Sequence, residues 1–192
     1  DLSNVSFDSN AQMTFDGTND YMPVPFSPSI PLYTLETVFY NINTIPNNDS
    51  AIGGPTSYQT MFWFNQDAPM GVSLGGWTSS ATNEAIHIWS SPSSPYYLTH
   101  TRDAVPSGYH HLTFTWNGSY YDIYLNGEKQ TVYAGNNGHA RLITLSHLTV
   151  GGDTSSGYIF NGNIDLVKVY SRGLTASEIK ANYNAIKGRF NI

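Results

Sequence analysis

The chain has 192 residues, 40% of them apolar and only 11% charged, which is enough for one domain with a proper core and a polar, weakly ionic surface. The formal net charge is −6 and the eight basic residues are scattered along the sequence. Nucleic acid is therefore not expected as a partner, because binding its phosphates requires a cluster of Lys and Arg. Because cysteine is absent, disulfides and thiolate metal sites are excluded, and no apolar run approaches the length of a membrane span.

Short strands separated by turn residues account for most of the chain. Alternating apolar and polar residues, bounded by Gly, Pro, Asn and Ser, predict strands at residues 5–7, 11–15, 21–24, 35–42, 51–54, 59–65, 71–77, 85–89, 96–101, 142–150 and 162–170. The proline-rich stretch 23–31 is expected at an edge or in a crossing loop, because proline has no backbone donor for a central strand. Residues 35–42 are apolar on both alternating faces, which predicts a strand buried on both sides.

Residues 109–134 contain the clearest hairpin pattern. Asn-Gly pairs that begin at Asn117 and Asn126 separate three short runs, and the first two runs alternate with a period of two. This predicts a three-strand antiparallel meander with one apolar face towards the core. The other face, with Tyr120, Asp122 and Tyr124, is a candidate concave surface.

One helix is expected near the end of the chain. Thr175 fits the N-cap position, and Glu178 three residues later completes a capping box. Leu174 and Ile179 are placed to form a hydrophobic staple over the cap. Gly188 suits the position just after the last helical residue.

Three stretches carry a family resemblance: FDGTNDYMPVP at 15–25, YHHLTFTWNGSYYDIYLNGE at 109–128, and FNGNIDLVKVYSRGLTASEIKANYNA at 160–185. Together they resemble a laminin-G-like domain of the concanavalin A-like lectin/glucanase superfamily, of the kind found in bacteriophage and other virus structural proteins. Tyr109 departs from the family, which usually has Trp before the His pair. The resemblance implies a single domain over 1–192, an all-β jelly-roll sandwich of two antiparallel sheets, and a non-catalytic binding role.

The acidic residues do not form the pattern of a glycosidase. Glycoside hydrolysis needs two carboxyls about 5–9 Å apart. The chain has only four glutamates, Glu36, Glu84, Glu128 and Glu178, and none is close to another or has an aspartate within five residues. Pairs across strands remain open, but no catalytic residue is predicted.

The histidines do not suggest a catalytic or metal site either. His110 and His111 are adjacent, so on a strand they face opposite ways and cannot share a metal. We expect one to be a hydrogen-bonded core residue and the other a surface residue.

No cofactor is required by any motif, but a structural calcium site is a hypothesis. Asp16 and Asp20 cluster in one turn, and the resemblance implies that Asp165 lies nearby, so their oxygens would suit Ca²⁺. The alternative is turn chemistry, in which aspartates cap tight turns through local hydrogen bonds.

Aromatic rings at strand ends suggest where a ligand would bind, because sugars stack on aromatic faces. The candidate ligand-binding residues are Trp77, Trp89, Tyr96, Tyr97, Tyr120 and Tyr124. Burial in the core is the alternative for each of them, and it is the favoured interpretation for Trp63 and Trp116.

The sequence therefore predicts a binding or adhesion module on a virion or cell surface that recognises a glycan or a surface protein. The alternative is a purely structural virion protein that decorates a capsid or forms a fibre, and a glycoside hydrolase is the third hypothesis. No membrane insertion is expected, the location is extracellular or on a virion, and a homo-oligomer remains open.

Overall fold

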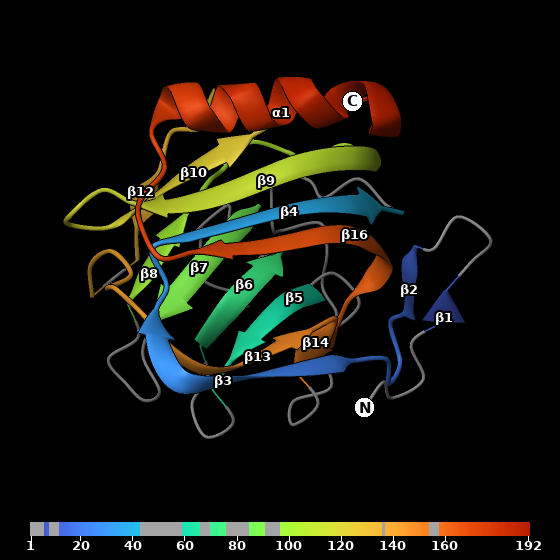
Figure 1. The fold of residues 1–192 in the computed structure, drawn as a ribbon, viewed down its shortest axis with the longest axis horizontal. Helices are drawn as coiled ribbons and strands as arrows, with labels where there is room; N and C mark the ends of the chain where they lie inside the picture. Colours follow the sequence, from blue (N-terminus) through green and yellow to red (C-terminus); the bar gives the residue numbers. More distant parts are fainter. Residues whose placement is uncertain are drawn as a thin grey trace.

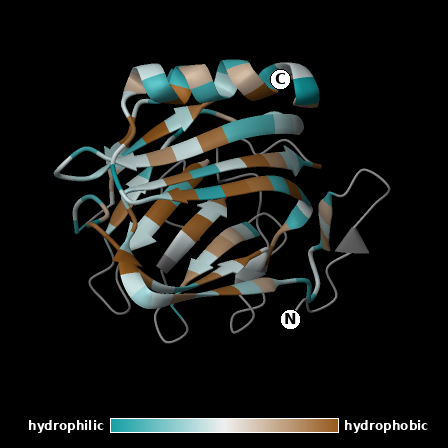
Figure 2. Ribbon diagram, viewed as in Figure 1, coloured by the Kyte–Doolittle hydropathy of each residue, from teal (hydrophilic) through white to brown (hydrophobic). Residues whose placement is uncertain are grey.

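The computed structural model describes residues 6–7, 12–42, 59–65, 70–75, 85–90, 97–135, 137–153 and 158–192. In this part of the chain two antiparallel sheets of seven strands each pack face to face, as the all-β sandwich prediction requires (Figure 1). Apolar and polar residues alternate along many of the strands (Figure 2), and buried apolar side chains form the core. We call the two layers the first and the second sheet.

The first sheet contains, in spatial order, β1 (Ser6–Phe7), β2 (Met13–Asp16), β16 (Asn161–Tyr170), β4 (Thr34–Asn41), β9 (Gly108–Trp116), β10 (Tyr121–Leu125) and β11 (Glu128–Lys129). The second contains β12 (Tyr133–Ala134), β8 (Leu98–His100), β7 (Ile86–Ser90), β6 (Met70–Leu74), β5 (Gln59–Phe64), β13 (Thr144–Val150) and β3 (Met22–Pro31). A separate pair joins β14 (Gly152–Asp153) to β15 (Tyr158–Ile159). The predicted strand at 51–54 lies outside the described residues.

The core lies between the two sheets and is rich in aromatic residues. Phe39, Phe62 and Phe114 are wholly buried there, on β4, β5 and β9. The prediction that 35–42 is buried on both sides is confirmed up to Asn41, since all but one residue of β4 is buried, whereas Ile42 lies beyond the strand and is exposed. The proline-bearing β3 is an edge strand, as expected, because its outer side needs no hydrogen-bond donors.

The meander forms β9, β10 and β11, but its two turns differ. Asn126 and Gly127 have φ of 53° and 73°, as a two-residue hairpin turn requires. The first connection is a longer loop, because Trp116 pairs with Tyr121 and the side chain of Asn117 accepts backbone N–H groups inside the loop.

The helix α1 (Ala176–Phe190) lies along the outer face of the first sheet and contacts β9 (Figure 1). The predicted capping box of Thr175 and Glu178 is present. The predicted helix end at Gly188 is wrong: the helix continues to Phe190, and Asn191 takes the left-handed conformation with φ of 56°. No helix in the described part of the chain is long and apolar enough to cross a membrane.

Candidate functional site

The face of the second sheet that points away from the core carries a row of aromatic side chains. Trp63 on β5 and Trp89 on β7 both pair with Gly71 on β6, which lies between them. Directly opposed residues of antiparallel strands share one face, so both indoles project from the same side of the sheet. We call this side the outer face of the second sheet.

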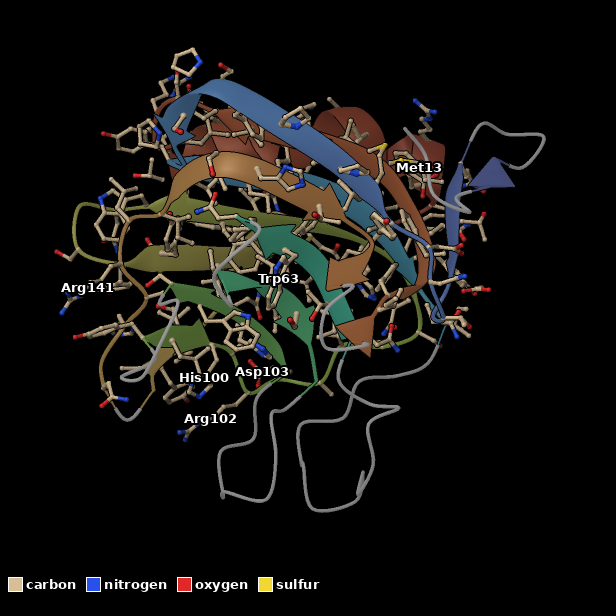
Figure 3. The ribbon with its side chains drawn as sticks, turned by 90° about the horizontal axis from the view of Figure 1, so that it is seen from below. Met13, Trp63, His100, Arg102, Asp103 and Arg141 are labelled. Atoms are coloured by element: carbon tan, nitrogen blue, oxygen red, sulfur yellow. The ribbon has the colours of Figure 1, made fainter. Side chains whose placement is uncertain are left out.

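Gly71 shapes the space between the two indoles. The Trp63 and Trp89 ring centroids are 6.1 Å apart and the rings meet edge to face at 84°. A Cβ atom at Gly71 would lie 2.5 Å from the backbone oxygen of Phe62, so no larger residue fits without a backbone shift. Trp63 is half-buried and lies over the middle of the face, whereas Trp89 is almost fully buried (Figure 3).

A second row on the same face is polar. Thr60 and Ser73 are cross-strand partners with hydroxyl oxygens 3.1 Å apart. The row continues through His87 and His100, which are partners on β7 and β8, to Tyr133 on β12. The His100 and Tyr133 rings stack with centroids 5.7 Å apart. The outer face therefore carries an aromatic row beside a polar row, and in the polar row only Tyr133 is exposed while its other members are buried.

Burial keeps the two histidines of this row neutral at neutral pH. The pKa of His87 is lowered to about 3 by burial and by the neighbouring His100. The pKa of His100 is lowered to about 4 by burial, helped by the charges of Arg102 and His139. The guanidinium carbon of Arg102 lies 4.0 Å from the centre of the Tyr133 ring, at the end of the polar row.

Acidic residues are absent from the described strands of this layer. None of the seven strands of the second sheet contains an aspartate or a glutamate along its described length. The glutamates that the structure describes belong to the other layer: Glu36 is buried beneath α1, and Glu128 and Glu178 form ion pairs with Lys180 and Arg172. Glu84 lies outside the described residues.

The structure separates the four predicted ligand-binding residues that it describes. Trp89 lies on the outer face of the second sheet. Tyr97 and Tyr120 converge at the edge of the sandwich, where Arg141 lies over the Tyr97 ring at 3.9 Å and His139 stacks on Tyr120 at 4.2 Å. Two further candidates, Trp77 and Tyr96, lie outside the described residues.

The prediction that Tyr124 belongs to an open concave surface is wrong. Tyr124 is buried in a small cluster with Leu174 and Ile179, because α1 covers this face of the meander. Tyr120 and Asp122 were predicted on the same face, and Asp122 is also largely buried, paired with Lys129 at 2.7 Å.

Trp63 was expected in the core, and it lies on the opposite face. An extra residue in β5 shifts the register between Thr60 and Phe62 and re-aims the side chains that follow. Trp116 packs against the core as expected. Sequence reasoning also missed His100 and Tyr133, because their proximity depends on β12 pairing with β8 and no local signal reports that pairing.

The two adjacent histidines face opposite ways, as predicted, but both are buried. His110 hydrogen-bonds the carbonyl of Pro106 at 2.8 Å and faces the core beside Phe39. One of the two was expected on the surface, yet His111 is also wholly buried, beneath α1, and stacks on Tyr183. As for Tyr124, the burial of His111 results from the packing of α1 on the sheet, which the strand pattern does not predict.

The aspartates of the calcium hypothesis do not come together. Asp20 accepts the backbone N–H of Asp16 at 2.7 Å, and Asp16 accepts that of Thr18 at 2.7 Å, as in turn chemistry. Asp165 lies four residues along β16 from Asn161, the partner of Asp16, which is about 13 Å of strand. Within the described residues no group of three or more His, Asp or Glu side chains is placed to hold a metal ion.

A family model described as the concanavalin A-like lectin/glucanases superfamily matches residues 16–180 of the chain. No curated protein sequence matches this chain. Among solved structures, domain 4 of AbnA, a GH43 extracellular arabinanase from Geobacillus stearothermophilus in complex with arabinotriose, is similar with a TM-score of 0.62 and 19% identity. That match covers 94% of this chain and 80% of the other.

Two further solved structures are similar over nearly all of this chain. The botulinum neurotoxin serotype D binding domain has a TM-score of 0.64 and 13% identity, over 96% of this chain and 46% of that one. Trypanosoma rangeli sialidase in complex with the inhibitor DANA has a TM-score of 0.61 and 16% identity, over 95% of this chain and 28% of that one. This chain thus spans less than half of either protein, and at these identities the likeness shows the fold alone.

Proposed function

Because the chain belongs to the concanavalin A-like lectin/glucanases superfamily, we propose that it is a carbohydrate-binding module whose ligand lies on the outer face of the second sheet. The observation that carries the proposal is the half-buried Trp63, set edge to face against Trp89 across Gly71. The flat C–H faces of a sugar pack well on an indole, and adjacent polar side chains fix its orientation. Tyr133, the exposed member of the polar row, supplies such a group on the same face.

The proposal includes no catalytic role. Both glycoside hydrolases and binding domains use this fold, so the distinction must come from the residues. Hydrolysis of a glycoside needs a pair of carboxyls beside the bound sugar. The absence of acidic residues from the described strands of the second sheet supports a module that binds without cleaving.

An extracellular setting fits this role, since glycan ligands are displayed there and the low charge content suits a surface protein. The similar arabinanase domain was solved with arabinotriose, which makes plant and microbial glycans reasonable first ligands to test. A virion location stays a prediction of the sequence resemblance.

The experiment is binding to a glycan array, followed by titration calorimetry with the best ligand. Trp63→Ala is expected to weaken binding by about 2 kcal/mol, roughly 30-fold in Kd, as truncation of a central tryptophan does. Tyr120→Ala is the matched control: it removes an aromatic ring at the sandwich edge, away from the outer face, and should leave the Kd unchanged. Thermal melting checks that both variants fold.

Three results would contradict the proposal in whole or in part. Silence of the folded protein across the array would favour a structural protein that binds protein neighbours. Equal losses in Trp63→Ala and Tyr120→Ala would place the ligand elsewhere. Release of reducing ends from a bound polysaccharide would contradict the non-catalytic part.

A further inference from the structure

Two arginines stand out because no carboxylate in the described part of the chain pairs with them. Lys129, Lys168, Arg172 and Lys180 form ion pairs with acidic residues. Lys187 and Arg189 lie in the last turn of α1, where positive charge favours the helix dipole. That leaves Arg102 and Arg141, each exposed and stacked on a tyrosine.

Arg102 lies on the outer face of the second sheet. It follows His100 by two residues, so on an extended chain both side chains point to the same side. The contact with Tyr133, at 4.0 Å, confirms this placement, because Tyr133 is the cross-strand partner of His100. Figure 3 shows His100 and Arg102 close together on this side of the molecule.

Arg141 occupies a different position. It stacks on Tyr97, which precedes Leu98 in β8 and so points to the opposite side from Leu98 and His100. The two arginines are well separated along the edge in Figure 3. Arg141 therefore has the same chemistry and the same aromatic support as Arg102, but it does not lie on the outer face.

No carboxylate among the described residues forms an ion pair that would balance the charge of Arg102. The protein has a net charge of −6, yet the described strands of the second sheet carry no carboxylate. Asp103 follows Arg102 directly and is exposed, but the two do not form an ion pair. A guanidinium held flat on a ring keeps its fork of N–H donors free for a planar anion.

His100 adds a second observation at the same place. Its side chain is wholly buried, and neither ring nitrogen has a hydrogen-bond partner in the part of the chain that the structure describes. Leaving a buried polar group unpaired costs about 1–3 kcal/mol, so packing alone does not explain a histidine there. Within the described residues, the end of the polar row thus combines an exposed arginine that no carboxylate pairs with and a buried imidazole stacked on Tyr133.

From this arrangement we propose that the module selects acidic glycans, with Arg102 pairing to a carboxylate or sulfate group of the sugar at the β8–β12 end of the outer face. This inference rests on the proposed function and specifies the class of ligand. The glycan chain packs on the half-buried Trp63, and an anionic group farther along the same chain pairs with Arg102, which is exposed beside Tyr133. Charge-assisted hydrogen bonds of this kind contribute about 1.5–3 kcal/mol, so an acidic ligand should bind about 10-fold or more tighter than its neutral counterpart.

The test uses matched pairs of glycans: galacturonate oligomers and their methyl esters, sialyllactose and lactose, sulfated and desulfated heparin fragments. The wild-type protein should prefer the acidic member of the pair it binds, and the three arms show whether carboxylate or sulfate is recognised. Arg102→Gln should abolish the preference while Arg141→Gln keeps it. Asp103→Asn should strengthen binding of the acidic member, because it removes the nearest negative charge.

The outcomes separate this inference from the proposed function. Tight binding of neutral and acidic members alike, lost in Trp63→Ala, would retain the carbohydrate-binding module and overturn the acidic preference. An acidic preference that survives Arg102→Gln, or that disappears in Arg141→Gln, would also overturn it. If no member of any pair binds, both proposals fall together.

Discussion

Asn182 on α1 donates a hydrogen bond from its side-chain amide to a carboxylate oxygen of Glu36 on β4, at 2.6 Å and across 146 residues of chain. The Glu36 side chain is wholly buried, and Lys168 and Tyr170 each donate to it at 3.0 Å. A buried carboxylate is tolerated only where donors surround it. The helix is therefore held to the first sheet by a satisfied charge as well as by apolar contacts.

Asn182→Ala should lower the free energy of unfolding by about 1–3 kcal/mol, because it removes a donor from a buried carboxylate. Urea denaturation followed by circular dichroism measures the loss. Asn184→Ala is the control, since Asn184 is exposed on the same helix and its removal should cost less than about 0.5 kcal/mol. Equal effects of the two changes would mean that Glu36 does not hold the helix.

Stability should fall as the pH drops from about 6.5 to 4, partly through His100. Its pKa is lowered to about 4 in the folded protein, from an ordinary value of 6.5, so within this window the unfolded chain binds a proton that the folded protein does not. His100→Phe removes that difference and keeps a ring to stack on Tyr133. When the pH is lowered from 7 to 4.5, the free energy of unfolding of the variant should therefore increase by about 2–3 kcal/mol relative to that of the wild type.

The measurement is urea denaturation of both proteins at several pH values. A dependence on pH will remain in the variant, since the pKa of His87 is also lowered, to about 3. Glu36 acts in a lower window: burial raises its pKa, but His111, Lys168 and Asn182 outweigh burial and lower it to about 2, so its stabilising contribution is lost as pH falls below about 4.5. Parallel curves for wild type and His100→Phe would contradict the prediction.

Gly71→Ala should destabilise the fold by about 1–3 kcal/mol, because its Cβ would meet the backbone oxygen of Phe62 at 2.5 Å and the strands would have to shift. It should also weaken glycan binding, since Gly71 lies between Trp63 and Trp89. Gly188→Ala is a matched control in α1, where nothing lies within 4 Å of the added atom. That change should stabilise the protein by up to about 1 kcal/mol, and thermal melting would show the opposite signs.

Calcium removal should leave the melting temperature unchanged. The carboxylates of Asp16 and Asp20 already accept backbone N–H groups, and Asp165 lies too far along β16 to complete a site with them. Melting in EDTA is compared with melting in millimolar CaCl₂. A clear increase with calcium would revive the hypothesis of a structural ion, and Asp20→Asn would then show whether this turn holds it.

Local patterns determined the elements of this fold. Alternation along residues 35–42 and 109–125 predicted strands that the structure contains, because a period of two places side chains on opposite faces whatever the neighbours are. The capping box at Thr175 and Glu178 depends on residues three apart, and the helix begins where it predicts. The prolines of β3 correctly indicated an edge, since a missing donor is a property of the residue itself.

Only the tertiary structure decided which faces are covered and which residues meet. The sequence did not reveal that α1 would cover the face of β10 that carries Tyr124. Nor did it reveal that a register shift in β5 would turn the side chain of Trp63 away from the core. The pairing of β12 with β8 joins Tyr133 to His100 across 33 residues of chain, and with Arg102 it creates the charged end of the outer face. Such contacts depend on long-range strand registers, which are set by the packing of whole layers and leave no local mark in the chain.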